Sequence, residues 1–182
     1  MSRDYLVPSE SSAKSGESEA LEVLAHVLGS GENCRLYRAL VIERGLALNA
    51  GATYSGTAVD YSKFAVFGVP KPGVSLPQLE AAIDGILAEL IAQGVSSDEL
   101  DRAKTRLIAE AVYAEDNQAT LARWYGSALA TGQTAENVRA WPDRIRAVTA
   151  EAVQNAARTW LDRRRSVTGY LVKTLQSEEK RS

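Results

Sequence analysis

The sequence predicts an α+β domain in which an antiparallel sheet has helices packed on one face. Three observations lead to this prediction: a strand close to the first residue, a hairpin of two strands, and a block of helices before a closing strand. Strands joined as a hairpin pair antiparallel, and helices grouped in a block are typical of α+β rather than α/β domains. We expect residues 1–173 to form one such domain and residues 174–182 to form a charged tail.

The first part of the chain is predicted to hold a strand and two helices. Residues 3–8 have the pattern of a strand that ends at a proline. From Glu19 onward, apolar residues recur at the spacing of one helix face. We expect Gly29 to cap this helix and Asn33 to cap a second, short helix that runs through Glu43.

Two neighbouring segments, 46–58 and 61–69, are predicted to form the hairpin. The first is rich in small residues, whose short side chains allow another backbone to approach the strand closely. Another chain and a helix of the same domain are equally expected to occupy this surface. These small residues are Ala47, Ala50, Gly51, Ala52, Ser55 and Gly56. We expect the free sheet face or a sheet edge to be a partner surface.

Capping signals define the helices that follow. Ser75 and Ser96 each open a capping-box pattern, and Gly94 is expected to end the first helix. Because proline disfavours a helix at the residue before it, we expect Pro142 to interrupt the helix that begins at Thr134. The predicted elements are helices 76–93, 97–114, 118–130 and 134–140, a last helix capped by Thr149, and a closing strand at 166–172.

The composition is that of an ordinary globular domain. The 182 residues are 45% hydrophobic and carry a net charge of −2, which gives no electrostatic argument for binding nucleic acid. The single cysteine excludes an internal disulfide. No apolar run reaches the length of a membrane span, and no signal-peptide pattern is present. A strand so close to the first residue suggests a fragment of a longer protein, which leaves the compartment open.

No residue is predicted to be catalytic or to bind a metal. A zinc site needs three or four ligands within reach, and His26 is the only histidine. We interpret His26 as a surface or half-buried structural residue and Cys34 as a small buried filler. The Gly29–Gly31 segment follows a predicted helix and lacks a third glycine, so a turn is favoured over a phosphate loop.

The charged and aromatic clusters are each interpreted structurally. The acidic pairs Asp98-Glu99 and Glu115-Asp116 fall at predicted helix ends, where carboxylates complement the helix dipole. The run 163–165 of three arginines is expected to be a solvated turn. We expect the tryptophans, Trp124, Trp141 and Trp160, to anchor the core. An unrelated enzyme that uses both acidic pairs stays possible if one cleft brings them together.

The run from Leu28 to Tyr54, with its Arg44-Gly45-Leu46-Ala47 motif, resembles the C-terminal-half domain of the pitrilysin/insulinase family of zinc peptidases. Other stretches match the same pattern in the same order, so that the resemblance covers about residues 4–172. They include residues 5–9, 69–73, 94–104, 131–132, 145–149 and 166–171.

The resemblance implies a non-catalytic domain, similar to the subunits of mitochondrial processing peptidase. The zinc motif of the family, H-x-x-E-H, is absent from this chain. Zinc is then expected in an N-terminal domain, while this C-terminal domain helps to close the peptide-degrading chamber. The implied partners are that zinc-bearing domain, a homologous subunit in a dimer, and a peptide substrate, in the periplasm or cytoplasm of a bacterium. A scaffold or inactive-partner subunit without its own activity is the alternative.

The resemblance also identifies one departure from the family. Members whose C-terminal half helps to bind substrate carry an Arg and a Tyr seven residues apart, and alignment on Gly45 places Val41 and Leu48 there. Neither side chain can donate a hydrogen bond to a peptide carbonyl. We therefore expect no substrate-binding residue in this chain, and expect the partner to supply that pair.

Overall fold

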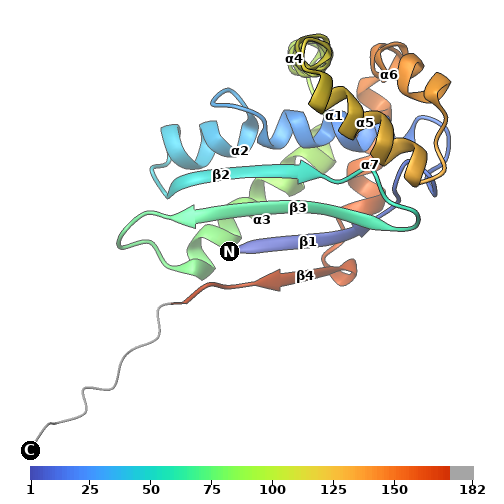
Figure 1. The fold of residues 1–182 in the computed structure, drawn as a ribbon. Coiled ribbons are helices and arrows are strands. Elements are labelled where there is room, and N and C mark those ends of the chain that lie inside the picture. Colours follow the sequence, from blue (N-terminus) through green and yellow to red (C-terminus); the bar gives the residue numbers. More distant parts are fainter. Residues whose placement is uncertain (173–182) are drawn as a thin grey trace, which may run out of the picture.

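The computed structural model describes residues 1–172 and contains a four-stranded antiparallel sheet of order β2-β3-β1-β4 (Figure 1). The predicted α+β class is confirmed. Strand β1, at the start of the chain, lies between β3 and β4, so that the two ends of the described chain meet in the sheet. The strands are β1 (Ser2–Val7), β2 (Ala47–Tyr54), β3 (Ser62–Pro70) and β4 (Ser166–Gly169). The predicted tail, 174–182, lies outside the described residues.

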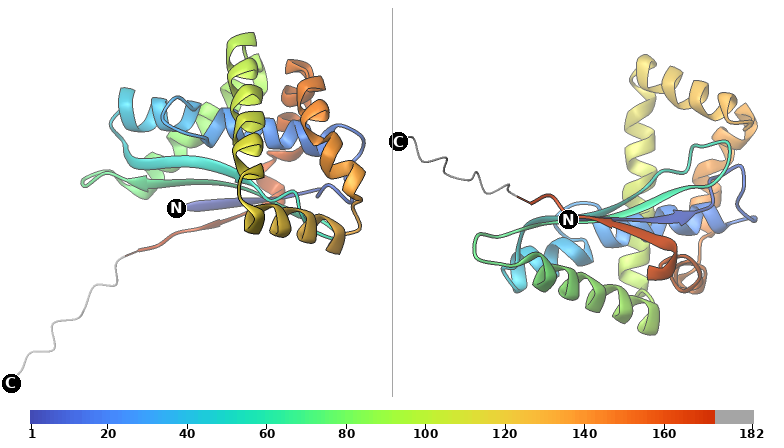
Figure 2. Two further views of the ribbon diagram at one scale, coloured as in Figure 1. Left: turned by 45° about the horizontal axis from the view of Figure 1, so that its top comes forward. Right: turned by 90° about the horizontal axis from the view of Figure 1, so that it is seen from below.

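The helices form two groups. Helices α1, α3 and α7 cover one face of the sheet, as the view from below shows (Figure 2). Helices α4, α5 and α6 stack beyond them, at the end of the sheet where β2 turns into β3 (Figure 1). The helices are α1 (Glu17–Gly29), α2 (Arg35–Tyr37), the π-helix η1 (Arg38–Glu43), α3 (Leu76–Gln93), α4 (Ser97–Glu115), α5 (Gln118–Ala130), α6 (Ala135–Ala147), α7 (Ala150–Trp160) and the 3₁₀-helix η2 (Arg163–Arg165).

Alternation along the strands separates the two faces of the sheet. In β1 the side chains of Tyr5 and Val7 are buried under the helices, whereas Leu6 between them is 52% exposed. The same alternation leaves Val69 of β3 and Val167 of β4 exposed on the opposite face. One sheet face is therefore core and the other carries exposed apolar side chains.

The small residues of β2 divide between these faces. Ala47, Ala50 and Ala52 are buried, and α1 packs on this strand. A helix of the same domain therefore covers much of the small-residue surface, which was one of the two expected outcomes. The hairpin partner β3 places Val66 opposite Ala52, as predicted for an antiparallel pair.

The end of α1 differs from the prediction. The helix begins at Glu17 instead of Glu19, and Gly29 is its last residue rather than a left-handed cap. The left-handed glycine is Gly31, with φ of 77°. The glycine at position 29 is instead required by packing, because a Cβ there would lie 1.9 Å from the backbone nitrogen of Ala52.

Two further predictions about helix boundaries were wrong. The cap position of α2 is occupied by Cys34 instead of Asn33, and its side chain makes no capping hydrogen bond. Pro142 lies inside α6, which continues to Ala147. The lost backbone bond is tolerated because the neighbouring Trp141 is buried in the core on this helix.

Three predicted helix caps agree with the structure, whereas the closing strand does not reach its predicted end. Ser96 and Glu99 form a complete capping box, and Gly94 ends α3 with φ of 77°. At Ser75 the hydroxyl oxygen accepts the backbone N–H of Gln78. The closing strand is shorter than the predicted 166–172 and ends at Gly169.

Candidate functional site

A pocket of about 440 Å³ lies beside the β2–β3 loop, under the stacked helices α4, α5 and α6. Its volume falls in the usual range for ligand sites. Six separate parts of the chain supply the polar and aromatic residues that line it. These include Glu10 before α1, Glu22 and His26 on α1, Tyr54 at the end of β2, Glu110 on α4, Trp124 on α5 and Trp141 on α6.

Glu22 is the most perturbed acid in this pocket. The indole nitrogen of Trp141 donates a hydrogen bond to its Oε2 atom at 2.9 Å. Burial raises the pKa of Glu22 to about 7 against the lowering effect of this bond, and the nearby Glu10 and Glu19 raise it further. Near neutral pH the carboxyl group therefore changes its charge.

Glu10 approaches the pocket from the loop before α1. Its backbone N–H donates to the carbonyl of Gly56 at 2.9 Å, which ties this loop to the β2–β3 connection. Burial raises the pKa of Glu10 as well, Arg144 lowers it, and Glu19 raises it. The hydroxyl of Tyr54 donates to the carbonyl of Pro8 at 2.8 Å, which also holds the loop before α1 against the end of β2.

His26 lies one helical turn after Glu22 and is half-buried, as predicted. Its Nδ1 atom is buried and has no hydrogen-bond partner among the described residues. Burial lowers the pKa of His26, which keeps the imidazole neutral at neutral pH. Within residues 1–172 no three His, Cys, Asp or Glu side chains are placed to hold a metal ion. The residues of the pocket do not fit a zinc site.

The aromatic wall of the pocket is formed by Trp124 and Trp141, whose rings meet edge to face with centroids 5.7 Å apart. Such a pair is a favourable arrangement of ring quadrupoles. Trp141 lies on α6, directly before Pro142.

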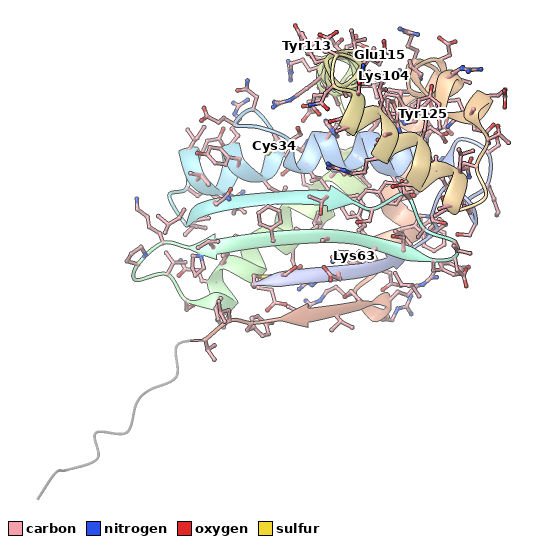
Figure 3. The ribbon with its side chains drawn as sticks, viewed as in Figure 1. Cys34, Lys63, Lys104, Tyr113, Glu115 and Tyr125 are labelled. Atoms are coloured by element: carbon pink, nitrogen blue, oxygen red, sulfur yellow. The ribbon has the colours of Figure 1, made fainter. Side chains whose placement is uncertain are left out.

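Cys34 is buried at the start of α2 (Figure 3) and is not among the residues that line this pocket. Burial raises the pKa of its thiol against the lowering effect of neighbouring backbone N–H groups. A thiol that resists ionisation is a poor nucleophile. The interpretation of Cys34 as a small buried filler agrees with this environment.

The two acidic pairs do not meet. Glu99 and Glu115 are sixteen residues apart on one helix, about 24 Å at the usual rise per residue. Glu99 is bound by Arg35 through two hydrogen bonds of 2.5 and 2.8 Å. An enzyme that uses both pairs in one cleft is therefore excluded.

The positions of the family Arg and Tyr are occupied by side chains without donors. Val41 lies on η1, partly buried against the core. Leu48 is the extra residue of a β-bulge between Ala47 and Asn49 and is exposed. A bulge leaves its extra residue outside the regular strand pairing. In this chain that residue is a leucine, whose side chain has no hydrogen-bond donor.

Sequence reasoning missed a buried arginine. Arg3, in the central strand, is 1% exposed and forms ion pairs with Glu80 and Asp84 of α3. Its Nε donates to the hydroxyl of Thr168 at 2.9 Å, and Arg163 of the predicted basic turn binds Asp84 at 2.9 Å. In the alternation of β1, Arg3 shares the inward face with Tyr5 and Val7, and this position could have indicated its burial.

A family model supports the resemblance seen in the sequence. The model of the peptidase M16 inactive domain matches residues 5–107, more than half of the chain. The chain belongs to this family. This membership agrees with the prediction from the resemblance that the chain is a C-terminal, non-catalytic domain of a zinc peptidase.

Solved structures show the same M16 fold. A protease from Helicobacter pylori matches with a TM-score of 0.82 and 20% identity over 91% of this chain. The inactive peptidase domain of a protein described as a zinc protease from Bordetella parapertussis matches with a TM-score of 0.81 and 22% identity over 95% of this chain. A peptidase M16 inactive domain from Pseudomonas fluorescens has a TM-score of 0.75 and 18% identity over 91% of this chain.

The fraction of each matched structure that this chain covers varies. The M16 chain described here spans 38% of the Helicobacter protease and 40% of the Pseudomonas chain, but 91% of the Bordetella domain. No curated protein matches the chain. Among the described residues, no helix combines the length and the apolar character that a bilayer crossing requires.

Proposed function

We propose that this chain is the non-catalytic C-terminal domain of a zinc metallopeptidase subunit and helps to form a closed chamber for peptide degradation. Its membership of the M16 inactive-domain family carries the proposal. The fraction of the Helicobacter protease that it spans, 38%, is consistent with a domain that acts together with a larger remainder.

The chemistry would then come from outside this chain. An N-terminal domain with the H-x-x-E-H motif would hold the zinc, which would activate a water molecule for peptide hydrolysis. This chain would contribute walls and a docking surface. The exposed apolar side chains on the open face of the sheet, Leu6, Val69 and Val167, support that role because such residues favour contact with another surface.

The test is reconstitution with the zinc-bearing half. We would co-express this chain with the H-x-x-E-H protein or segment encoded beside it and measure cleavage of a quenched fluorescent peptide library. We expect chelator-sensitive cleavage that requires both parts. Equal cleavage by the zinc-bearing part alone would contradict the proposal.

A pair of variants locates the contact. Val167→Arg on the open sheet face should reduce cleavage at least tenfold in the reconstituted enzyme, because a charge would be buried at the interface. Tyr113→Arg, at a comparably exposed position of 76% on α4, is the matched control and should leave cleavage unchanged. Equal effects of both variants would remove the open sheet face from the proposal.

The alternative is a scaffold or inactive-partner subunit of a peptidase-like complex. The sequence encoded next to this chain distinguishes the two functions. An H-x-x-E-H motif in that sequence supports the peptidase, whereas a motif that is missing from every associated chain supports the scaffold.

A further inference from the structure

The pocket beside the β2–β3 loop is lined by more acidic than basic side chains. Three carboxylates, those of Glu10, Glu22 and Glu110, line it. The only other titratable groups in its lining are His26, whose pKa burial lowers, and Tyr54, whose pKa burial raises, so that both stay neutral. The proposed peptidase role makes no use of these groups.

The cations closest to the pocket already have partners. Arg144 is paired with Glu19 and donates to the carbonyl of Asn137 at 2.7 Å. Arg106 is paired with Glu110 at 3.0 Å. No ion pair among the described residues reaches Glu10 or Glu22, so their charge is left without a cationic partner.

Both unpaired carboxylates are open to the pocket. Trp141 occupies Oε2 of Glu22, and the second oxygen, Oε1, has no hydrogen-bond partner within residues 1–172. Oε1 is also not one of the buried side-chain atoms that lack a hydrogen-bond partner, so it is accessible from the pocket. The side chain of Glu10 lies against Gly56, where a Cβ would come within 3.2 Å of its Oε1 atom, and likewise accepts no hydrogen bond from the described residues.

The pocket lining also contains two indole rings, one of which donates its N–H to Glu22. Trp124 and Trp141 line the same pocket. An ammonium or guanidinium group is attracted to the face of an indole ring, and the attraction increases as the site excludes water. Carboxylates and indole rings that line one pocket are suited to a cation with an apolar stem.

We infer that this pocket binds an organic cation, an alkylammonium or guanidinium group that contacts Glu10 and Glu22 and packs its stem against Trp124 and Trp141. The group could belong to a free amine or to a lysine or arginine side chain of a peptide. A bare metal ion does not fit, because no three ligands converge within residues 1–172. The inference does not depend on the proposed peptidase function, since every group that it uses is in this chain.

Binding can be measured on the whole chain by NMR through the indole ¹⁵N–¹H signal of Trp141, identified by its loss in Trp141→Phe. Agmatine, acetyl-Ala-Arg-Ala-amide and the neutral acetyl-Ala-Gln-Ala-amide would be titrated at pH 8, where Glu22 is ionised. We expect agmatine and the arginine peptide to saturate and the glutamine peptide to bind at least tenfold more weakly. Binding by agmatine that is ten times tighter than by the peptide would assign the site to free amines, and the reverse order to basic side chains.

Two variants and one competitor complete the test. Glu10→Gln/Glu22→Gln should weaken cation binding at least tenfold, and it should fold because it removes buried charge. Glu136→Gln, which removes an exposed carboxylate on α6, is the control with unchanged binding. Equal affinity for the arginine and glutamine peptides, unchanged binding in the double variant, or displacement of the cation by equimolar Ca²⁺ would each overturn the inference.

Discussion

Gly29 at the end of α1 lies directly against Ala52 of β2, so close that a Cβ at position 29 would be 1.9 Å from the Ala52 backbone nitrogen. The contact sets the distance between the first helix and the edge strand of the sheet. Since α1 also carries Glu22 and His26 into the pocket, the position of the pocket depends on this approach.

The first prediction concerns this contact. Gly29→Ala should reduce the free energy of unfolding by about 3 kcal/mol, because the strand backbone cannot move aside for a methyl group. Urea unfolding followed by circular dichroism measures the change. Gly85→Ala, inside α3 with open space around its Cβ position, is the control and should raise stability by about 0.5–1 kcal/mol. Equal effects at both sites would show that the packing contact is unimportant.

The second prediction concerns the raised pKa of Glu22, about 7 in the folded protein against 4.5 in an unperturbed group. The folded state holds this proton more tightly than the unfolded state, so stability falls as pH rises from about 4.5 to 7. Glu22→Gln should be more stable than the natural protein at pH 8, by up to about 3 kcal/mol, and similar to it at pH 4. Thermal unfolding across this range measures the difference.

Other groups in the pocket titrate in the same range and must be separated from Glu22. The raised pKa of Glu10 acts in the same direction, and the lowered pKa of His26 acts in the opposite one. Both are present in Glu22→Gln, so the difference between the two proteins isolates Glu22. A difference that does not change with pH would contradict a raised pKa.

The third prediction concerns Glu99, whose pKa the Arg35 hydrogen bond holds at about 2 against the effect of burial. A depressed pKa gives stability that is present above about pH 4.5 and is lost as pH falls towards 2. Glu99→Gln should cost about 2 kcal/mol at pH 7 and should flatten the acid side of the stability curve. Acid unfolding of the variant with an unchanged pH dependence would count against this assignment.

The fourth prediction concerns the buried ion pairs of Arg3. Arg3→Met should cost about 1–3 kcal/mol, because it removes the buried ion pairs and the hydrogen bond to Thr168, although Arg163 still binds Glu80 and Asp84. Arg139→Met removes an arginine whose pair with Glu136 spans 3.8 Å at the surface. That control should change stability by less than about 0.5 kcal/mol, measured by denaturant unfolding. A similar small change in Arg3→Met would mean that the buried ion pairs contribute little to stability.

Local interactions explain which elements could be predicted. The capping box at Ser96 and Glu99 and the left-handed Gly94 depend on atoms within one turn of chain. The hairpin of β2 and β3 depends on side-chain type along two adjacent segments. In these cases the neighbouring residues supply most of the relevant energy, so pattern and propensity were sufficient.

The wrong predictions occur where a distant contact outweighs local preference. Pro142 would end an isolated helix, but the burial of Trp141 and its hydrogen bond to Glu22, 119 residues away, stabilise the continuous α6. Glycine is the residue most common at helix C-caps, but Gly29 is required here because the backbone of Ala52 packs directly against it. Neither contact partner can be recognised from the sequence around these positions.

The sequence by itself determined the α+β class, the family and the absence of a zinc motif, because these follow from the order of elements and from the residues present. Only the tertiary structure decided that Glu10, Glu22, Trp124 and Trp141 share one pocket. Their segments are separated by many residues, and they meet because α1 packs on β2 while α4, α5 and α6 stack at that end. Burial in this common site then sets the charge of each acid, which no residue type specifies alone.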